Sequence, residues 1–221
     1  MFEARIATGR GGPVRWLAAL AAGGCLALCA APATLDDEAV FRVEEDWELV
    51  LNQPGAELES PQFHTVMSPS AGLQSTYFQA TFNYRDAETY APGGMQVQAV
   101  RGSDVSAIKE VGSAPLSTTA ETVTWTQQIR LKDGTLRFLI KNGQSSSWGS
   151  FGGASMLLNT TSTLPNLNGY TTSTSVGNSL ITYGSNRVNT LSITRVRYYG
   201  SDGSLLHTDE SPKLVYVLQG P

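Results

Sequence analysis

The chain has 221 residues, with 15 Lys or Arg against 19 Asp or Glu, so its formal net charge at pH 7 is −4. This acidic balance argues against binding to the phosphate backbone of nucleic acid. Nucleic acid is therefore not an expected partner. The two cysteines, Cys25 and Cys29, both lie near the N-terminus. Stability is expected to come from a hydrophobic core and not from disulfides.

The first 33 residues have the order of a secretory signal peptide. Three arginines precede an apolar stretch at residues 16–31, and small residues follow it. We expect cleavage after Ala33 and export to the extracellular space, the periplasm or the cell envelope. An alternative is a lipoprotein signal with the lipid attached at Cys25. The apolar stretch is interrupted by glycine and is too short for a membrane span, so the chain is not expected to be transmembrane.

Residues 34–221 carry a net charge of −6 and are predicted to form a single domain. A strand is predicted in the second half of residues 39–51, where alternate side chains separate into two faces. One face holds Glu45, Trp47, Leu49 and Leu51, and the other holds Glu44, Asp46 and Glu48. Further strands are predicted at 62–67, 78–84 and 95–99, whereas 105–111 is ambiguous.

A hairpin is predicted around the Asp133-Gly134 pair. Apolar residues alternate with polar ones at 123–132 and again at 135–141. The Asp-Gly pair between them suits the tight primed turns that match the twist of paired strands. Because an isolated hairpin is marginally stable, its apolar side is expected to pack on a second sheet.

The last part of the chain is predicted to hold four more strands. They lie at 155–158, 179–183, 187–199 and 213–218, with a Ser/Thr/Asn-rich loop starting at residue 159. The apolar positions change phase within 187–199, which predicts a bulge near Thr194. Residues 213–218 are apolar on both faces, as in a central or covered strand. About 10 to 12 short strands without a convincing helix predict an all-β, antiparallel, jelly-roll-like β-sandwich.

Residues 192–199, SITRVRYY, resemble the closing strand of concanavalin A-like sandwiches, the group of legume lectins, laminin G modules and retaining β-glucanases. Residues 45–50 and 61–66 resemble segments of uncharacterised exported proteins of planctomycete-type bacteria, which have no assigned activity. The first resemblance implies a concanavalin A-like fold and leaves a binding module and a glycosidase as alternatives.

An exported, non-catalytic binding or adhesion module, with carbohydrate as its ligand, is the function we predict. The candidate ligand residues are aromatic rings and amides in loops: Trp148, Phe151, Asn166, Asn168 and Tyr170. Such rings stack on sugars, and amides bond their hydroxyls. The partner would be a glycan or another cell-surface polymer. Alternatively, the aromatic side chains fold back and plug the open end of the sandwich.

Two other functions stay open. A retaining glycosidase needs two carboxyl groups about 5 Å apart, and the E-x-D-x-E spacing puts Glu44, Asp46 and Glu48 on one strand face. The alternative for these three is a solvated strand face, and we expect no catalytic residue. A structural cell-envelope or matrix protein, in which exposed strands pair with other copies, is the third function.

No cofactor is expected, although calcium stays open, with Asp86 or Asp202 as contributors. His64 and His207 are far apart in the sequence and lack a neighbouring ligand at metal-site spacing. The sequence makes no prediction of the oligomeric state.

Overall fold

The computed structural model describes residues 38–52, 60–71, 76–84, 94–111, 116, 120–181 and 188–217. The predicted signal peptide with Cys25, and the candidate calcium ligand Asp86, lie outside the described residues. Thirteen strands and one 3₁₀ turn are present in the described part, and no α-helix is found there.

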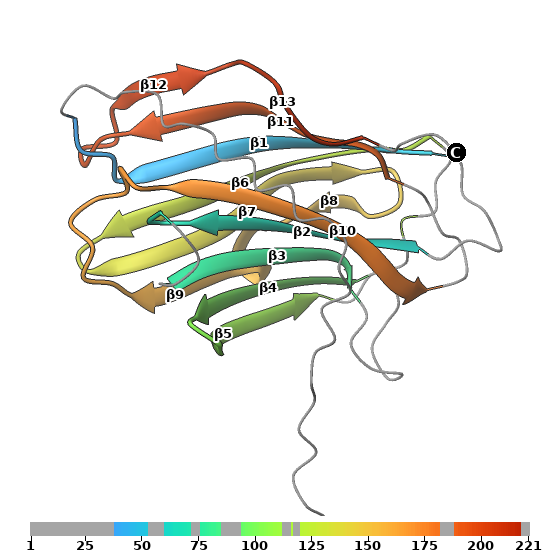
Figure 1. Ribbon diagram of the computed structural model, residues 1–221, viewed down its shortest axis with the longest axis horizontal. Helices are drawn as coiled ribbons and strands as arrows, with labels where there is room; N and C mark the ends of the chain where they lie inside the picture. The colour runs from blue at the N-terminus through green and yellow to red at the C-terminus, as the bar shows by residue number, and fades with distance from the viewer. Residues whose placement is uncertain are drawn as a thin grey trace, which may run out of the picture.

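Two antiparallel sheets stack face to face, and the strand axes of one sheet are roughly aligned with those of the other (Figure 1). The larger sheet has the order β12-β11-β1-β6-β7-β8, and β13 also pairs with β11 and β9 with β7. Its strands are β1 (Arg42–Leu51), β6 (Thr122–Lys132), β7 (Thr135–Ser145), β8 (Gly149–Phe151), β9 (Leu157–Thr161), β11 (Val188–Tyr199), β12 (Leu205–Asp209) and β13 (Lys213–Val217).

The smaller sheet has the order β10-β2-β3-β4-β5. Its strands are β2 (Ser60–Ser68), β3 (Thr76–Tyr84), β4 (Gly94–Arg101), β5 (Asp104–Val111) and β10 (Thr171–Ile181). The predicted all-β antiparallel sandwich is therefore confirmed, with slightly more strands than the 10 to 12 expected.

The predicted β6–β7 hairpin is confirmed. Lys132 pairs with Thr135, and the two residues between them, Asp133 and Gly134, have φ of 49° and 69°. Positive φ at both central positions is the property of the primed turn that the Asp-Gly pair predicts.

The core lies between the sheets and is built from the predicted alternation. Trp47 of β1 stacks on its cross-strand neighbour Trp125 of β6, with ring centroids 5.7 Å apart. Phe82 of β3 contacts Trp125 at 4.7 Å and stacks on Phe63 of β2 at the same distance. All four rings are almost fully buried. Aromatic contacts thus join the two sheets.

The predicted bulge near Thr194 is also confirmed. Asp46 pairs with Arg195 and Trp47 with Ile193, so Thr194 has no partner in the ladder. Its hydroxyl instead donates to the backbone oxygen of Asp46 at 3.1 Å. The extra residue lets β11 keep apolar side chains toward the core on both sides of the bulge.

Three strand predictions were wrong in position or environment. β10 begins at Thr171, eight residues before the strand predicted at 179–183, and pairs along β2. Gly153–Met156 forms a 3₁₀ turn, and the strand predicted at 155–158 begins only at Leu157. β13 is not central: in the described part it pairs with β11 alone, and its Leu214 is 53% exposed.

Candidate functional site

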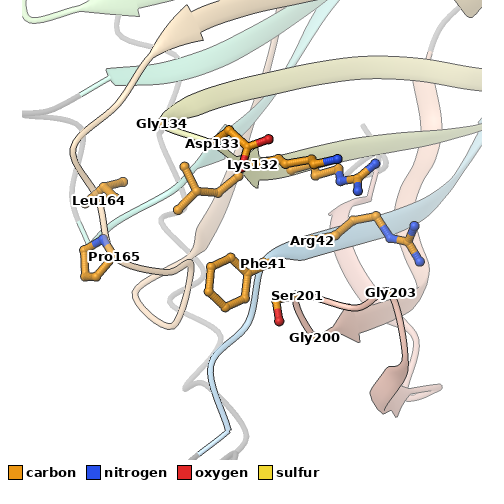
Figure 2. A pocket seen from close by; sticks show the side chains of 12 residues that line it. Phe41, Arg42, Lys132, Asp133, Gly134, Leu164, Pro165, Gly200, Ser201 and Gly203 are labelled. Atoms are coloured by element: carbon orange, nitrogen blue, oxygen red, sulfur yellow. The ribbon is translucent and has the colours of Figure 1, made fainter.

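A pocket of about 330 Å³ opens at the end of the sandwich where β1 begins. Its walls come from the start of β1, the β6–β7 turn, the loop after β9 and the β11–β12 turn. It is lined by Phe41, Arg42, Arg130, Leu131, Lys132, Asp133, Gly134, Leu164, Pro165, Gly200, Ser201 and Gly203. Figure 2 shows the Phe41 ring between Pro165 and Ser201, and the Arg42 side chain directed away from that ring. The pocket thus joins an apolar centre to a basic rim.

Backbone hydrogen bonds fix the position of Phe41. Its N–H donates to the carbonyl oxygen of Tyr199, and its own carbonyl oxygen accepts from the N–H of Leu131, each at 2.8 Å. The preceding residue, Val40, accepts from the N–H of Leu167 at 2.8 Å. The backbone of Phe41 is therefore held on both sides by β11 and β6. Its half-buried ring also packs against the core, so the ring needs little ordering when a ligand binds.

Three arginines lie directly opposite one another on neighbouring strands, on the outer face of the larger sheet. Arg42 of β1 pairs with Arg130 of β6, and Arg130 pairs with Arg137 of β7. We call Arg42, Arg130 and Arg137 the arginine row. On its other side Arg42 pairs with Tyr199, and its guanidinium carbon lies 3.6 Å from the centroid of that ring. Like charges placed directly opposite destabilise a sheet, so the row costs stability.

Next to the arginine row, two of the three carboxylates considered for glycosidase chemistry form an ion-pair network. Glu44 accepts from Lys141 at 2.7 Å and pairs with Arg197 at 3.1 Å. Asp46 pairs with Arg195 at 2.7 Å and with the same Arg197 at 2.9 Å. Both oxygens of each carboxylate are thus engaged by cations.

Glu48 lies further along the same outer face, opposite Thr124 and Ser192. The predicted common face of Glu44, Asp46 and Glu48 is therefore present. Its arrangement is nevertheless that of a sheet-stabilising network, because a general acid must be free to give up a proton to a substrate.

Trp148 and Phe151, two of the predicted ligand residues, lie at the end of the sandwich remote from the pocket. They follow β7 near the end of β1 at Leu51, and both half-buried rings pack against the core. The centroid of Phe82 is 6.4 Å from that of Trp148 and 6.3 Å from that of Phe151. The buried carboxylate of Glu121 fixes the preceding turn by accepting from the N–H of Ser147 at 2.8 Å.

Asn166, Asn168 and Tyr170, the other predicted ligand residues, lie at the pocket end. The Asn168 side-chain oxygen accepts from the N–H of Val40 at 2.9 Å, and the Asn166 side-chain oxygen accepts from the N–H of Asn168 at 3.0 Å. Both amides thus brace the loop beside Phe41. The five predicted residues therefore fall into two groups at opposite ends and do not form one site.

The Tyr170 hydroxyl reaches a carboxyl group inside the sandwich, Glu45 of β1. The other oxygen of Glu45 accepts from Trp47 Nε1 at 2.8 Å and Gln127 Nε2 at 2.6 Å. Gln127 in turn accepts from the hydroxyl of Thr65, in the opposite sheet, at 2.8 Å. This buried network links the pocket loop to both sheets.

Burial raises the pKa of Glu45 to about 7, and the hydrogen bonds from Gln127 and Trp47 offset only part of that rise. Burial also raises the pKa of Tyr198 to about 12, with a further contribution from the charge of Glu45. The network is closed within the protein, so we assign it to the structure of the sandwich.

The described residues considered for metal binding, Asp202, His64 and His207, have other partners. Asp202 accepts from the N–H of Ser204 at 2.8 Å and thereby closes the β11–β12 turn. Nδ1 of His64 lies 2.9 Å from the hydroxyl of Thr81, and the His207 ring packs against Tyr198. Within the described ranges, no three His, Cys, Asp or Glu side chains are grouped so as to hold a metal ion.

The pocket and the arginine row were not found from the sequence. Arg130 and Arg137 fall on the polar faces of predicted strands, whereas Arg42 precedes the strand predicted in the second half of residues 39–51. Only the pairing register brings residues 42, 130 and 137 together. In the part of the chain that the structure describes, no helix has the length and apolar character needed to cross a membrane. Comparison of the sequence with models of protein families and with curated proteins finds no match.

Proposed function

We propose that this protein is an exported, non-catalytic binding or adhesion module for carbohydrate, and that the Phe41 pocket is its ligand site. The observation that carries the proposal is the aromatic ring of Phe41, placed in a pocket whose rim offers hydrogen-bond donors and acceptors. Sugar rings have apolar faces and hydroxyl edges, so they suit such a mixed lining. A volume of about 330 Å³ is at the lower end of the range for small-ligand sites.

The lining supports binding more than catalysis. Among the described lining residues, Asp133 supplies a carboxylate, and the other charged ones, Arg42, Arg130 and Lys132, are basic. Retaining and inverting glycosidases require two carboxyl groups on either side of the scissile bond. A concanavalin A-like classification agrees with a binding role and stays a prediction.

A second pocket, of about 370 Å³, is less suited to the role. Its cation, Arg101, already donates to the hydroxyl of Thr76 at 3.2 Å and to the backbone oxygen of Thr161 at 3.0 Å. Among the described residues, no aromatic side chain lines it. We therefore place the ligand at Phe41.

The test is retention of purified residues 34–221 on a panel of immobilised neutral and acidic polysaccharides, with and without calcium. Phe41→Ala should weaken retention at least tenfold, because the stacking surface is lost. Ile108→Ala, on the exposed edge strand β5 of the other sheet, is the matched control. Trp148→Ala and Tyr170→Phe test the residues predicted from the sequence. If Phe41→Ala binds like the unaltered protein, the ligand site lies elsewhere.

A structural envelope or matrix role is the second candidate, and one observation favours it. The edge strand β5 leaves Val105 50% exposed and Ile108 48% exposed. Exposed apolar side chains on an edge strand invite pairing with another copy. Sedimentation velocity at increasing concentration would show growing assemblies, and Ile108→Lys would abolish them. A monomer at all concentrations would contradict this role.

A further inference from the structure

We propose that the glycan is acidic, and that its carboxylate or sulfate groups bind along the arginine row while the Phe41 pocket takes a sugar ring. This inference rests on the proposed function of the pocket and names the class of ligand. The row begins in the pocket, because Arg42 and Arg130 belong to its lining, and it continues to Arg137 on the open face of the sheet.

The outer face of the larger sheet is basic although the protein is acidic. On β1, β6, β7 and β11, the outward positions hold seven basic side chains and three acidic ones. The basic ones are Arg42, Arg130, Lys132, Arg137, Lys141, Arg195 and Arg197, and the acidic ones are Glu44, Asp46 and Glu48. The formal charge of the whole chain is −4. Positive charge is thus concentrated on one face, where it attracts anions.

Within this face, the ion pairs leave one group of cations unneutralised. Glu44 and Asp46 form ion pairs with Lys141, Arg195 and Arg197. Arg130, Lys132 and Arg137 form no salt bridge with any described carboxylate. These free cations are the ones at and beside the pocket, so an arriving anion meets them together with the sugar-binding surface.

Arg42 differs from Arg130 and Arg137 in having an aromatic ring and a carboxylate beside its guanidinium. Its guanidinium lies over the Tyr199 ring, and its Nε is 3.6 Å from Glu44 Oε1. That Nε is nevertheless buried with no hydrogen-bond partner among the described residues. Stacking holds the guanidinium plane in place, which lowers the entropy lost when an anion binds it.

The geometry favours a linear acidic glycan over other anions. A guanidinium offers a planar pair of donors that matches a carboxylate or sulfate. Neighbouring strands are about 4.8 Å apart, so the row presents three such donors at regular short intervals. Duplex nucleic acid would extend far beyond three arginines, and there it would face a molecule of net negative charge.

The experiment titrates residues 34–221 with polygalacturonate, dextran sulfate, neutral dextran and duplex DNA. We expect binding to one or both acidic glycans, weaker binding to dextran, and a fall in affinity with rising NaCl. Arg130→Gln and Arg137→Gln should each lower the affinity for the acidic glycan about three- to tenfold. Lys109→Gln is the matched control, since Lys109 is an exposed cation on β5 of the other sheet.

The same variants separate a binding role from a structural one. The three arginines carry like charges that face one another, so removing one should leave the melting temperature unchanged or raise it. Binding should therefore fall without loss of the fold. A loss of fold in both variants would overturn the inference, because the row would then be structural.

Two glycan outcomes distinguish this inference from the proposed function. Neutral glycans could bind as tightly as acidic ones, with an affinity that falls in Phe41→Ala but is unchanged in both arginine variants. That result would contradict the acidic ligand and leave the proposed binding module intact. If no glycan of either kind is retained, the proposed function fails as well. DNA binding that depends on the same arginines would overturn the choice of a glycan.

Discussion

Glu45 shows how one carboxyl group can link local structure to pH. It lies between the sheets without exposure to solvent, and its raised pKa of about 7 means that it takes up a proton on folding in weakly acidic solution. Because this pKa exceeds the ordinary value of 4.5, the contribution of Glu45 to stability is fully present below pH 4.5. It is lost as the pH rises through 7.

We predict that Glu45→Gln reduces this pH dependence. The glutamine oxygen can accept from Trp47 and Gln127, and its amide can donate to Tyr170, so the variant resembles the protonated acid. At pH 8 the variant should be more stable than the unaltered protein by on the order of 3 kcal/mol, and at pH 4.5 about equal. Urea unfolding across pH 4.5–8 measures both values. Parallel pH profiles for the two proteins would contradict the assignment.

The absence of a side chain at Gly143 leaves the space in which the ring of Phe151 packs. A Cβ at position 143 would lie 2.4 Å from Cδ2 of Phe151, so the ring must move if any side chain is introduced. Gly143→Ala is expected to lower the free energy of unfolding by about 1–3 kcal/mol. Gly149→Ala is a less suitable control because Gly149 has φ of 67°. Ser146→Ala, exposed in the same turn, serves instead. Equal stability of the two variants would contradict the packing role of Phe151.

At the scale of elements, the acidic side chains on the outer face of β1 are held by cations from two other strands, β7 and β11. Glu44→Gln would leave Lys141 and Arg197 without one shared partner. Since these cations are 29% and 21% exposed, we expect a loss of about 2 kcal/mol, less than for a fully buried pair. The control is Glu48→Gln, because Glu48 has no salt bridge to a described residue. Urea unfolding that gives equal stabilities would show that the network adds nothing.

The sequence predicts elements well where side chains alternate sharply, as in β1 and the β6–β7 hairpin. It fails for β10, because Thr171–Thr174 reads as a polar loop and its pairing with β2 depends on residues more than 100 positions away. It places Glu45 correctly on the apolar face of β1. The partners of Glu45 come from β6 and from the loop at Tyr170, and no local pattern could identify them.

The same limit applies to the candidate site. Aromatic side chains in Ser/Gly-rich loops are good candidates for ligand contacts when only composition is known. In the structure, the buried Glu121 organises the turn before Trp148, so that the indole packs against Phe82. The arginine row depends on register between strands separated by about 90 residues, which alternation alone does not specify.

For the whole molecule, the core and the polar network both cross from one sheet to the other. Phe82 of the smaller sheet packs on Trp125 of the larger one, and Thr65 bonds Gln127 between the same two sheets. Neither sheet can therefore lose its structure without exposing the aromatic side chains of the other. We predict that residues 34–221 unfold in one cooperative transition. Tryptophan fluorescence, which reports Trp47, Trp125 and Trp148, and far-UV circular dichroism should give coincident urea curves. Separate midpoints would show that the sheets unfold independently and would contradict the prediction of a single domain.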